Sequence, residues 1–486
     1  MKERATSFFA KLSIPVGRLF GIPDLNASAK EPRLRRSRER YRRALISGTS
    51  AVFSRLIWII TLIISVPLTV NYLGAERYGM WMTISSLIAL LQFADLGIGY
   101  GMLNAVAEAS GKDDIAAAKK YISSGFFYLL GFSSLIGIAF ALIYSLIPWG
   151  TVYNVSGSQA LAEAGPATAF FAVIFLANIP LSIVGKVQQA YQEGYKESLW
   201  QAVGRIFGLV FLLIVIWLQL GLPWLVLAAA GSPVFAQLAN FFSHFYFKNP
   251  AISPTLSQVK KDSANFVLRI GFLFFLLQLV VAVAFAADTI VLAQIIGPEA
   301  VAIYTIAFQA FLFVPTLVRV LLSPFWPAYG EATSRGDYDW VDKTFSRSIR
   351  ASLIVTGLTA LFLVFAGAKL IELWAGPEII PPTILLLSLG INSILLYGWG
   401  DPVAMFLNGT GKVAFEVTWA VPMAIANIVI SILLTQRIGI SGVAWGTSIS
   451  YFLLMVIPTT LFLRRRRLLR SQGKTNVQIS DNLEST

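Results

Sequence analysis

The sequence has no cysteine and few ionisable residues. Among its 486 residues there is a single histidine, His244. Disulfides, thiol nucleophiles and thiolate metal sites are therefore excluded, and a histidine-based catalytic site has almost nothing to build on. Only 13% of the residues are charged, against roughly 25% in soluble domains. No hydrophilic stretch is long enough for a catalytic domain, so we expect no enzyme, no metal site and no cofactor.

Apolar runs take up most of the chain. Hydrophobic residues make up 56% of it, and the mean hydropathy is +0.70. Runs of about 20 apolar residues between short polar segments are typical of membrane helices rather than of a barrel. We predict an all-α polytopic membrane protein with about twelve spans. They lie near 44–70, 79–103, 121–147, 166–189, 198–219, 222–246, 266–293, 299–326, 346–373, 380–407, 414–436 and 440–463.

The formal net charge of +13 is concentrated beside the membrane segments. Residues 1–43 contain twelve Lys or Arg, and four arginines at 464–467 follow the last span. Basic flanks of this kind fix orientation or meet anionic lipid, so they argue against a nucleic-acid partner. Alternate loops are basic, near 112–120, 186–196, 248–269, 335–350 and 412. The positive-inside rule then places both termini in the cytoplasm.

A long internal repeat divides the chain. Residues 73–76 are echoed at 296–299 and residues 108–110 at 331–333, both 223 positions later, as 74 to 297 and 108 to 331 show. We predict an N-terminal extension (1–43), a six-helix half (44–246), a cytoplasmic linker (247–265), a second half (266–463) and a tail (464–486). Six spans per half give parallel repeats, the plan of a transporter with a central cavity.

Three arginines interrupt the predicted spans. Arg55 lies in the first span, Arg205 in the fifth and Arg319 in the eighth. Ionisable groups inside a membrane are costly and usually face a cavity or a partner. An arginine in a cavity presents a planar fork of donors that matches phosphate. These three residues are our candidates for binding an anionic substrate, although Arg55 and Arg205 also fit structural ion pairs.

Two acidic residues also fall in the predicted spans. Asp95 is near the middle of the second span and Asp288 near the outer end of the seventh. Asp95 fits either a coupling-ion site or an ion pair with Arg55 that holds the first two helices together. Asp288 fits a similar role, or a position in contact with water. The acids are fewer than the arginines, which favours an anionic substrate over a cationic one.

Residues 72–81, 93–99 and 107–109 carry a resemblance to a known family. Their pattern is Leu-Gly-x-Glu-x-Tyr-Gly, followed by a span with Asp-Leu-Gly. It resembles the Wzx-type O-antigen and exopolysaccharide flippases of the multidrug/oligosaccharidyl-lipid/polysaccharide superfamily. The resemblance covers roughly residues 45–465 and extends to Asp95 and to the loop glycines and acid, Gly74, Glu76 and Gly79. The basic N-terminal extension lies outside it.

This resemblance implies a flippase of the bacterial inner membrane. Its substrate would be an undecaprenyl-diphosphate-linked oligosaccharide for O-antigen or lipopolysaccharide assembly, moved by alternating access with H⁺ or Na⁺ as coupling ion. Membrane lipids and polysaccharide assembly proteins would be its partners. The alternative within the superfamily is a cation-coupled multidrug exporter. A membrane glycosyltransferase or polymerase would need a large outward loop or an acid cluster, and a non-transporting scaffold would not need the repeat.

Overall fold

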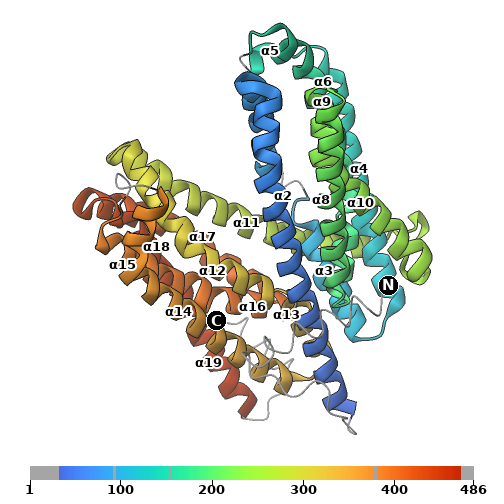
Figure 1. Ribbon diagram of the computed structural model, residues 1–486. Helices are drawn as coiled ribbons and strands as arrows, with labels where there is room; N and C mark the ends of the chain where they lie inside the picture. The colour runs from blue at the N-terminus through green and yellow to red at the C-terminus, as the bar shows by residue number, and fades with distance from the viewer. Residues whose placement is uncertain (1–31, 91–94, 154, 376–379, 472–486) are drawn as a thin grey trace. The chain divides into compact units, whose positions relative to one another are not determined.

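The protein is built from helices. The computed structural model describes residues 32–90, 95–153, 155–375 and 380–471, and these residues contain helices and no strand. Figure 1 shows their arrangement. The helices are Pro32–Leu90 (α2), Ile98–Gly111 (α3), Ile115–Tyr144 (α4), Trp149–Val152 (α5), Ser158–Leu181 (α6), Ile183–Ala190 (α7), Gly194–Trp217 (α8), Leu222–Val226 (α9), Ser232–Phe242 (α10), Lys261–Ile295 (α11), Pro298–Leu322 (α12), Phe325–Ser334 (α13), Tyr338–Ala375 (α14), Thr383–Ser393 (α15), Asp401–Gly409 (α16), Val413–Ile438 (α17), Ser441–Tyr451 (α18) and Ile457–Ser471 (α19). Short π-helical segments cover Leu227–Gly231, Ser243–Lys248, Ile394–Gly400 and Phe452–Val456, and 3₁₀ turns cover Pro250–Ile252 and Leu256–Gln258.

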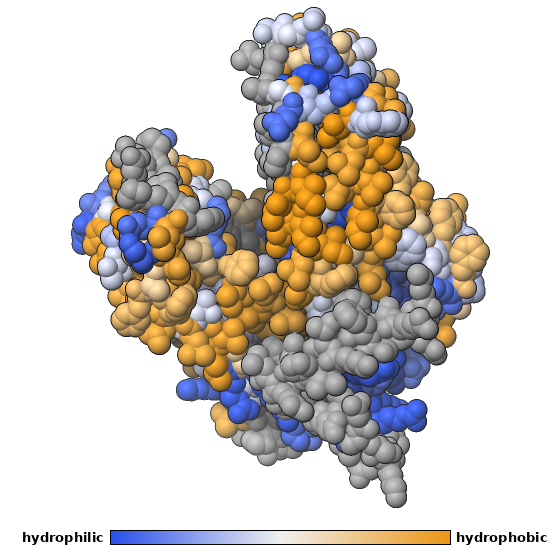
Figure 2. All heavy atoms as spheres, viewed as in Figure 1, coloured by the Kyte–Doolittle hydropathy of each residue, from blue (hydrophilic) through white to orange (hydrophobic). Residues whose placement is uncertain are grey.

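The helices have the length and surface of membrane spans. Within the described residues, 11 segments are long and apolar enough to cross a membrane. They correspond to all the predicted spans except the one at 79–103, part of which (91–94) lies outside the described residues. Large apolar side chains face outward, for example Leu142 (72% exposed) and Phe365 (82% exposed). In Figure 2 such hydrophobic side chains cover the flanks of the helices, as lipid contact requires.

The first two predicted spans differ from the structure. Helix α2 runs through the first span, the loop after it and the start of the second span, with a kink at Gly74 (φ 72°). Residues 95–97 form a turn, and α3 begins at Ile98. The prediction of one continuous helix over 79–103 is therefore wrong. Gly97 explains the break, because its φ of 72° is left-handed and a Cβ there would lie 2.1 Å from the carbonyl oxygen of Gly271.

The chain forms two compact units. The first unit contains the described residues up to Phe275 together with Val320–Lys343 and Gly409–Gly411. The second unit contains Leu276–Arg319, Thr344–Asn408 and the described residues from Lys412 onward. The units do not coincide with the two sequence repeats, because α13 belongs to the first unit. The division into six-helix halves at 44–246 and 266–463, with a linker at 247–265, stays a prediction.

Each unit has its own apolar core. In the first unit α8 packs against α2 and α10, while α3 packs against α4, α7 and α13. Met102, Ile122 and Ile183 are fully buried among these helices. In the second unit α18 packs against α15 and α17, with Leu385 and Val443 fully buried. The helices packed around these two cores carry the charged intramembrane residues described below.

The backbone supports the sequence repeat. Gly74 and Gly297, which are 223 positions apart, both have positive φ, at 72° and 124°. Asp113 and Gly336, also 223 apart, have φ of 57° and 72°. Positive φ is uncommon outside glycine, so its recurrence at equivalent positions indicates the same local fold. The repeat in the amino-acid sequence is thus also present in the backbone conformation.

Helices α3 and α13 are equivalent pieces of the two repeats and end in the same way. The amide of Asp114 donates to the carbonyl of Ala109 at 2.9 Å, and the amide of Asp337 donates to that of Ala332, also at 2.9 Å. The two helices pack against each other within the first unit. A Cβ on Gly330 would lie 3.5 Å from the Cβ of Ala107, its own equivalent in the first repeat. This contact therefore relates the two repeats by local pseudo-symmetry.

Candidate functional site

Arg55 and Arg205 lie on neighbouring helices of the first unit, α2 and α8. Nη1 of Arg205 donates to the backbone carbonyl of Ser54 at 2.8 Å and to its hydroxyl at 2.9 Å. The Arg55 guanidinium lies over the ring of Trp58, 4.2 Å from its centroid, and the two positive charges are close enough to repel. Among the described residues neither arginine forms an ion pair. The two guanidinium groups therefore form a positive site without a counter-charge.

A cavity of about 300 Å³ lies in the same unit. Among the described residues, Lys186 of α7 is the only Lys or Arg that lines it, and its Nζ is 3.7 Å from the ring centroid of Tyr100. The Tyr100 ring stacks on Trp326, with centroids 5.1 Å apart and planes 5° apart. Nε1 of Trp326 donates to Asn104 at 2.8 Å, which fixes the indole. The cavity thus combines one cation with an aromatic wall.

Amide and carboxylate groups complete the wall of this cavity. Glu197 accepts hydrogen bonds from Gln189 at 2.6 Å and from Gln201 at 3.0 Å. Polar groups around an aromatic platform are the usual lining of a site that orients a polar ligand. Such a lining suits the hydroxyl groups and apolar faces of a sugar.

The Asp95 side chain accepts hydrogen bonds from the backbone at the turn before α3 and does not pair with Arg55. Its carboxylate accepts from the amides of Gly97 at 3.0 Å and Gly99 at 3.3 Å, which satisfies free donors at the start of α3. Lys186 lies beside it, since a Cβ on Gly99 would meet Oδ2 of Asp95 at 2.8 Å and Cγ of Lys186 at 3.3 Å. The Asp95 side chain therefore bonds the backbone at the start of α3 and lies next to a lysine.

Arg319 lies in the second unit and is neutralised. Its Nε donates to Oδ2 of Asp401 at 2.9 Å, and its Nη2 lies 2.8 Å from Oδ1, so the pair is bidentate. The guanidinium also lies 5.4 Å from the ring centroid of Tyr397. The Arg319 side chain is 53% exposed, while Asp401 is 12% exposed. Unlike Arg55, this arginine already has an anionic partner.

Asp288 is buried in the second unit, not in contact with water as one sequence reading suggested. The residue is 3% exposed. Its Oδ2 accepts from the Tyr304 hydroxyl at 2.9 Å and from the Thr447 hydroxyl at 3.3 Å. Within the described part of the chain, Oδ1 of Asp288 and Nδ2 of Asn427 have no hydrogen-bond partner. Neither Asp288 nor Asp95 forms an ion pair with an arginine among the described residues.

Comparison with known proteins decides the family. The model of the family described as polysaccharide biosynthesis protein matches residues 42–333, more than half of the chain. The chain belongs to this polysaccharide biosynthesis family. A second family model, MatE, matches residues 274–433. Membership confirms the resemblance that the motifs at 72–81 and 93–99 indicated.

Individual proteins of the same kind agree with the polysaccharide biosynthesis family. A Salmonella typhimurium protein assigned as an O-antigen transporter is 24% identical, over 87% of this chain and 97% of that protein. A Yersinia pseudotuberculosis protein assigned as an O-antigen export protein is also 24% identical, over 76% of this chain and 84% of that protein. Their names describe transport, which confirms the prediction of a transporter and not an enzyme.

Solved structures confirm the all-α membrane fold. A crystal structure of a MATE protein in the bent conformation superposes with a TM-score of 0.78 and 13% identity, covering 92% of this chain and all (100%) of that chain. At this identity the likeness concerns the fold alone. Together with the apolar helices, it makes this member of the polysaccharide biosynthesis family a multi-pass bacterial membrane protein.

Sequence reasoning missed three charged residues in this family member. Lys186 was counted among the basic loop residues, whereas it lies in α7 and lines a cavity. Asp401 begins α16 and Glu416 lies in the first turn of α17, both within segments long and apolar enough to cross the membrane. Oε2 of Glu416 is buried without a partner. The sequence did contain a signal for these two acidic residues, because each of them lies inside an apolar run.

Proposed function

We propose that this protein moves an undecaprenyl-diphosphate-linked oligosaccharide across the bacterial inner membrane, for assembly of O-antigen or another surface polysaccharide. The family and the O-antigen names of the relatives support this class of substrate. Alternating access around a cavity between repeated halves is the general mechanism of such transporters. Polysaccharide assembly proteins would receive the transported unit.

The observation that carries this proposal is the unneutralised pair Arg55 and Arg205. Two arginines of apolar helices that form no ion pair among the described residues are costly unless an anion binds them. Ser54 already occupies one nitrogen of Arg205 and holds that side chain in place. The remaining donors of both guanidinium groups suit the oxygens of a diphosphate. A drug exporter for organic cations would not place uncompensated positive charge there.

Arg319 takes a different part in the proposal. The guanidinium donors of Arg319 are bonded to Asp401. A phosphate must therefore displace that carboxylate before Arg319 can bind the phosphate. Arg319 would then bind substrate in only some states of the cycle. The exchange of Asp401 for phosphate would give the second unit a way to respond to the substrate.

Coupling to an ion gradient is assigned to Asp288. Among the described residues its Oδ1 has no hydrogen-bond partner, while Oδ2 accepts from the hydroxyls of Tyr304 and Thr447, so Oδ1 is the candidate atom for a proton or a sodium ion. Asp95 is bound by two backbone amides, which suits a structural role better than an ion site.

The alternation of basic and non-basic loops supports cytoplasmic termini.

The test is complementation of a strain that lacks the gene. Loss of surface polysaccharide with accumulation of lipid-linked repeat units is the expected phenotype. Arg55→Ala and Arg205→Ala should fail to restore the polysaccharide at wild-type protein levels. Arg269→Ala is the matched control, because Arg269 is an exposed arginine of α11 and should complement. Unchanged polysaccharide with altered drug sensitivity would replace this proposal with the exporter.

A further inference from the structure

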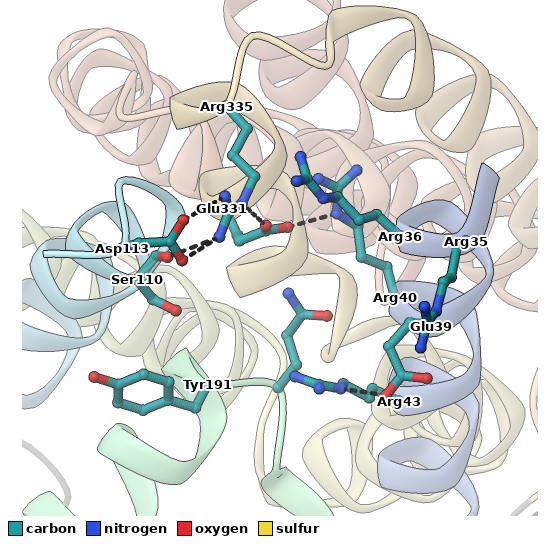
Figure 3. Close-up of a pocket in the computed structure, with 11 residues that line it drawn as sticks. Arg35, Arg36, Glu39, Arg40, Arg43, Ser110, Asp113, Tyr191, Glu331 and Arg335 are labelled. Atoms are coloured by element: carbon teal, nitrogen blue, oxygen red, sulfur yellow. Dashed lines mark hydrogen bonds and ion pairs between the residues drawn. The ribbon is translucent and has the colours of Figure 1, made fainter. Parts of the chain in front are cut away.

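The N-terminal end of α2 forms one wall of a second, larger pocket in the first unit. The pocket has a volume of about 630 Å³, within the range of about 300–1,000 Å³ typical of small-ligand sites. Figure 3 shows how the side chains of α2 approach those of α3 and α13 across it. Five arginines line it: Arg35, Arg36, Arg40, Arg43 and Arg335. Three of the pocket's lining residues are acidic, so positive charge is in excess.

The carboxylates that line the pocket are all occupied. Glu39 accepts from Arg43 at 2.7 Å, and Asp113 accepts two bonds from Arg335, at 2.9 and 2.7 Å. Glu331 is shared by Arg40 and Arg335, as the dashed lines in Figure 3 indicate. Arg35 and Arg36 form no ion pair among the described residues and are exposed. The excess charge therefore resides on these two side chains.

Two buried polar atoms of the lining residues also lack partners. Arg40 is 4% exposed and bonds Glu331 and Asp337 (2.6 Å), but its Nη2 makes no hydrogen bond. Gln192 is 6% exposed, and its Oε1 is likewise unpaired. A buried polar atom without a partner is costly, because it has lost its hydrogen bonds to water. Nη2 of Arg40 is a donor, and a free donor in the wall of a charged pocket points to a ligand with acceptor oxygens.

We propose that this pocket binds the phosphate of a lipid headgroup at the face of the membrane that the sequence predicts to be cytoplasmic. Arginine forks match phosphate oxygens, and basic residues beside a membrane helix attract anionic headgroups. Gln192 also lines the cavity of Lys186, so the two cavities share a wall. The headgroup could belong to the transported lipid or to an anionic membrane phospholipid, because both present the same oxyanion.

The test uses the purified full-length protein and inorganic pyrophosphate. Pyrophosphate binding, followed by calorimetry at low salt, should weaken at least tenfold in the double variant Arg35→Gln/Arg36→Gln. Both side chains are exposed and unpaired, so the variant should fold normally. Arg38→Gln is the control, because Arg38 is on the same helical end but does not line the pocket. Absence of binding to the wild type, or an equal loss in the control, would overturn the proposal.

A second arm identifies the source of the phosphate. The same titration is made in nanodiscs of neutral lipid and of lipid containing phosphatidylglycerol. If phosphatidylglycerol abolishes pyrophosphate binding to the wild-type protein, the site belongs to membrane phospholipid. If binding is unaffected, the site serves a diphosphate ligand such as the transported lipid. The measurement uses no glycan, so its outcome is independent of the proposed transport function.

Discussion

Ser334 lies against Gly111, the residue that holds the same position in the first repeat. A Cβ on Gly111 would be 1.6 Å from Oγ of Ser334, 2.9 Å from its Cβ and 3.0 Å from the carbonyl oxygen of Glu331. The Ser334 hydroxyl is itself engaged, donating to that carbonyl at 2.9 Å. The close approach of α3 and α13 therefore depends on glycine at position 111.

Substitution of this glycine should loosen the contact between the repeats. In Gly111→Ala the new methyl group must displace Ser334 and break its hydrogen bond, and overpacking of this kind costs about 1–3 kcal/mol. The melting temperature of the detergent-purified protein should fall. Gly131→Ala is the control, because a Cβ on Gly131 of α4 meets nothing within 4 Å, and it should not destabilise the protein. Equal melting temperatures for the two variants would show that α3 and α13 are further apart.

A disulfide at the same contact should stop transport. The chain has no cysteine, so a pair can be introduced without removing any. A Cβ on Gly330 would lie 3.5 Å from that of Ala107, within the range of about 3.5–4.5 Å for a disulfide. We expect Ala107→Cys/Gly330→Cys to cross-link on mild oxidation, lose complementation and regain it on reduction. Continued transport by the cross-linked protein would mean that α3 and α13 need not separate.

Arg335 should matter more than Lys112, its equivalent in the first repeat. Arg335 holds Asp113 in a bidentate pair and lowers the pKa of that carboxyl, so both groups are charged at neutral pH. Among the described residues Lys112, at the end of α3, pairs only with Glu108 of that helix, an exposed contact of about 0.5 kcal/mol at most. Arg335→Gln should reduce complementation severalfold and Lys112→Gln should not. Similar effects of the two variants would argue against a special role for the Arg335 pair.

Lys186 should be required for transport because, in the described part of the chain, no other cation lines its cavity. Lys186→Met keeps most of the side-chain volume but removes the charge over Tyr100, so we expect at least a tenfold loss of polysaccharide export. Lys186→Arg should keep part of it. Protein level and melting temperature should stay close to wild type in both. Full activity of the methionine variant would remove this cavity from the substrate path.

Asp288 should link transport to the ion gradient. Asp288→Asn keeps the shape of the side chain and removes its charge in a buried site. Transport by this variant should no longer respond to a change in pH or in sodium concentration. Tyr304→Phe, which removes one hydrogen bond to Asp288, should shift the response without abolishing it. An unchanged dependence on both ions in Asp288→Asn would place the coupling site elsewhere.

The sequence was sufficient for the helical spans and the repeat. Long apolar runs identify membrane helices because the bilayer leaves few alternatives to a helix. The equivalence of positions 74 and 297 follows from the constant spacing of the sequence repeat. The break at residues 95–97 was not predicted, because a glycine in an apolar run is compatible with a continuous helix. Its close approach to Gly271 is a tertiary contact that no local pattern contains.

The candidate site was only partly predictable. Arg55 and Arg205 stood out as charges in apolar runs, but the sequence could not show that Arg205 bonds Ser54 or that Arg319 is paired with Asp401. Pairing depends on how distant helices pack. Lys186 was missed because it lies near a span end, where a lysine usually faces the membrane surface.

The most direct test of the account is transbilayer movement of a lipid-linked oligosaccharide in proteoliposomes. The purified protein, reconstituted with undecaprenyl-diphosphate oligosaccharide under an ion gradient, should move the lipid from one leaflet to the other. The Arg55→Gln/Arg205→Gln variant should be reduced to the rate of empty liposomes, and Arg269→Gln should match the wild type. Movement at the wild-type rate in the double variant, or none with the wild-type protein, would contradict the account.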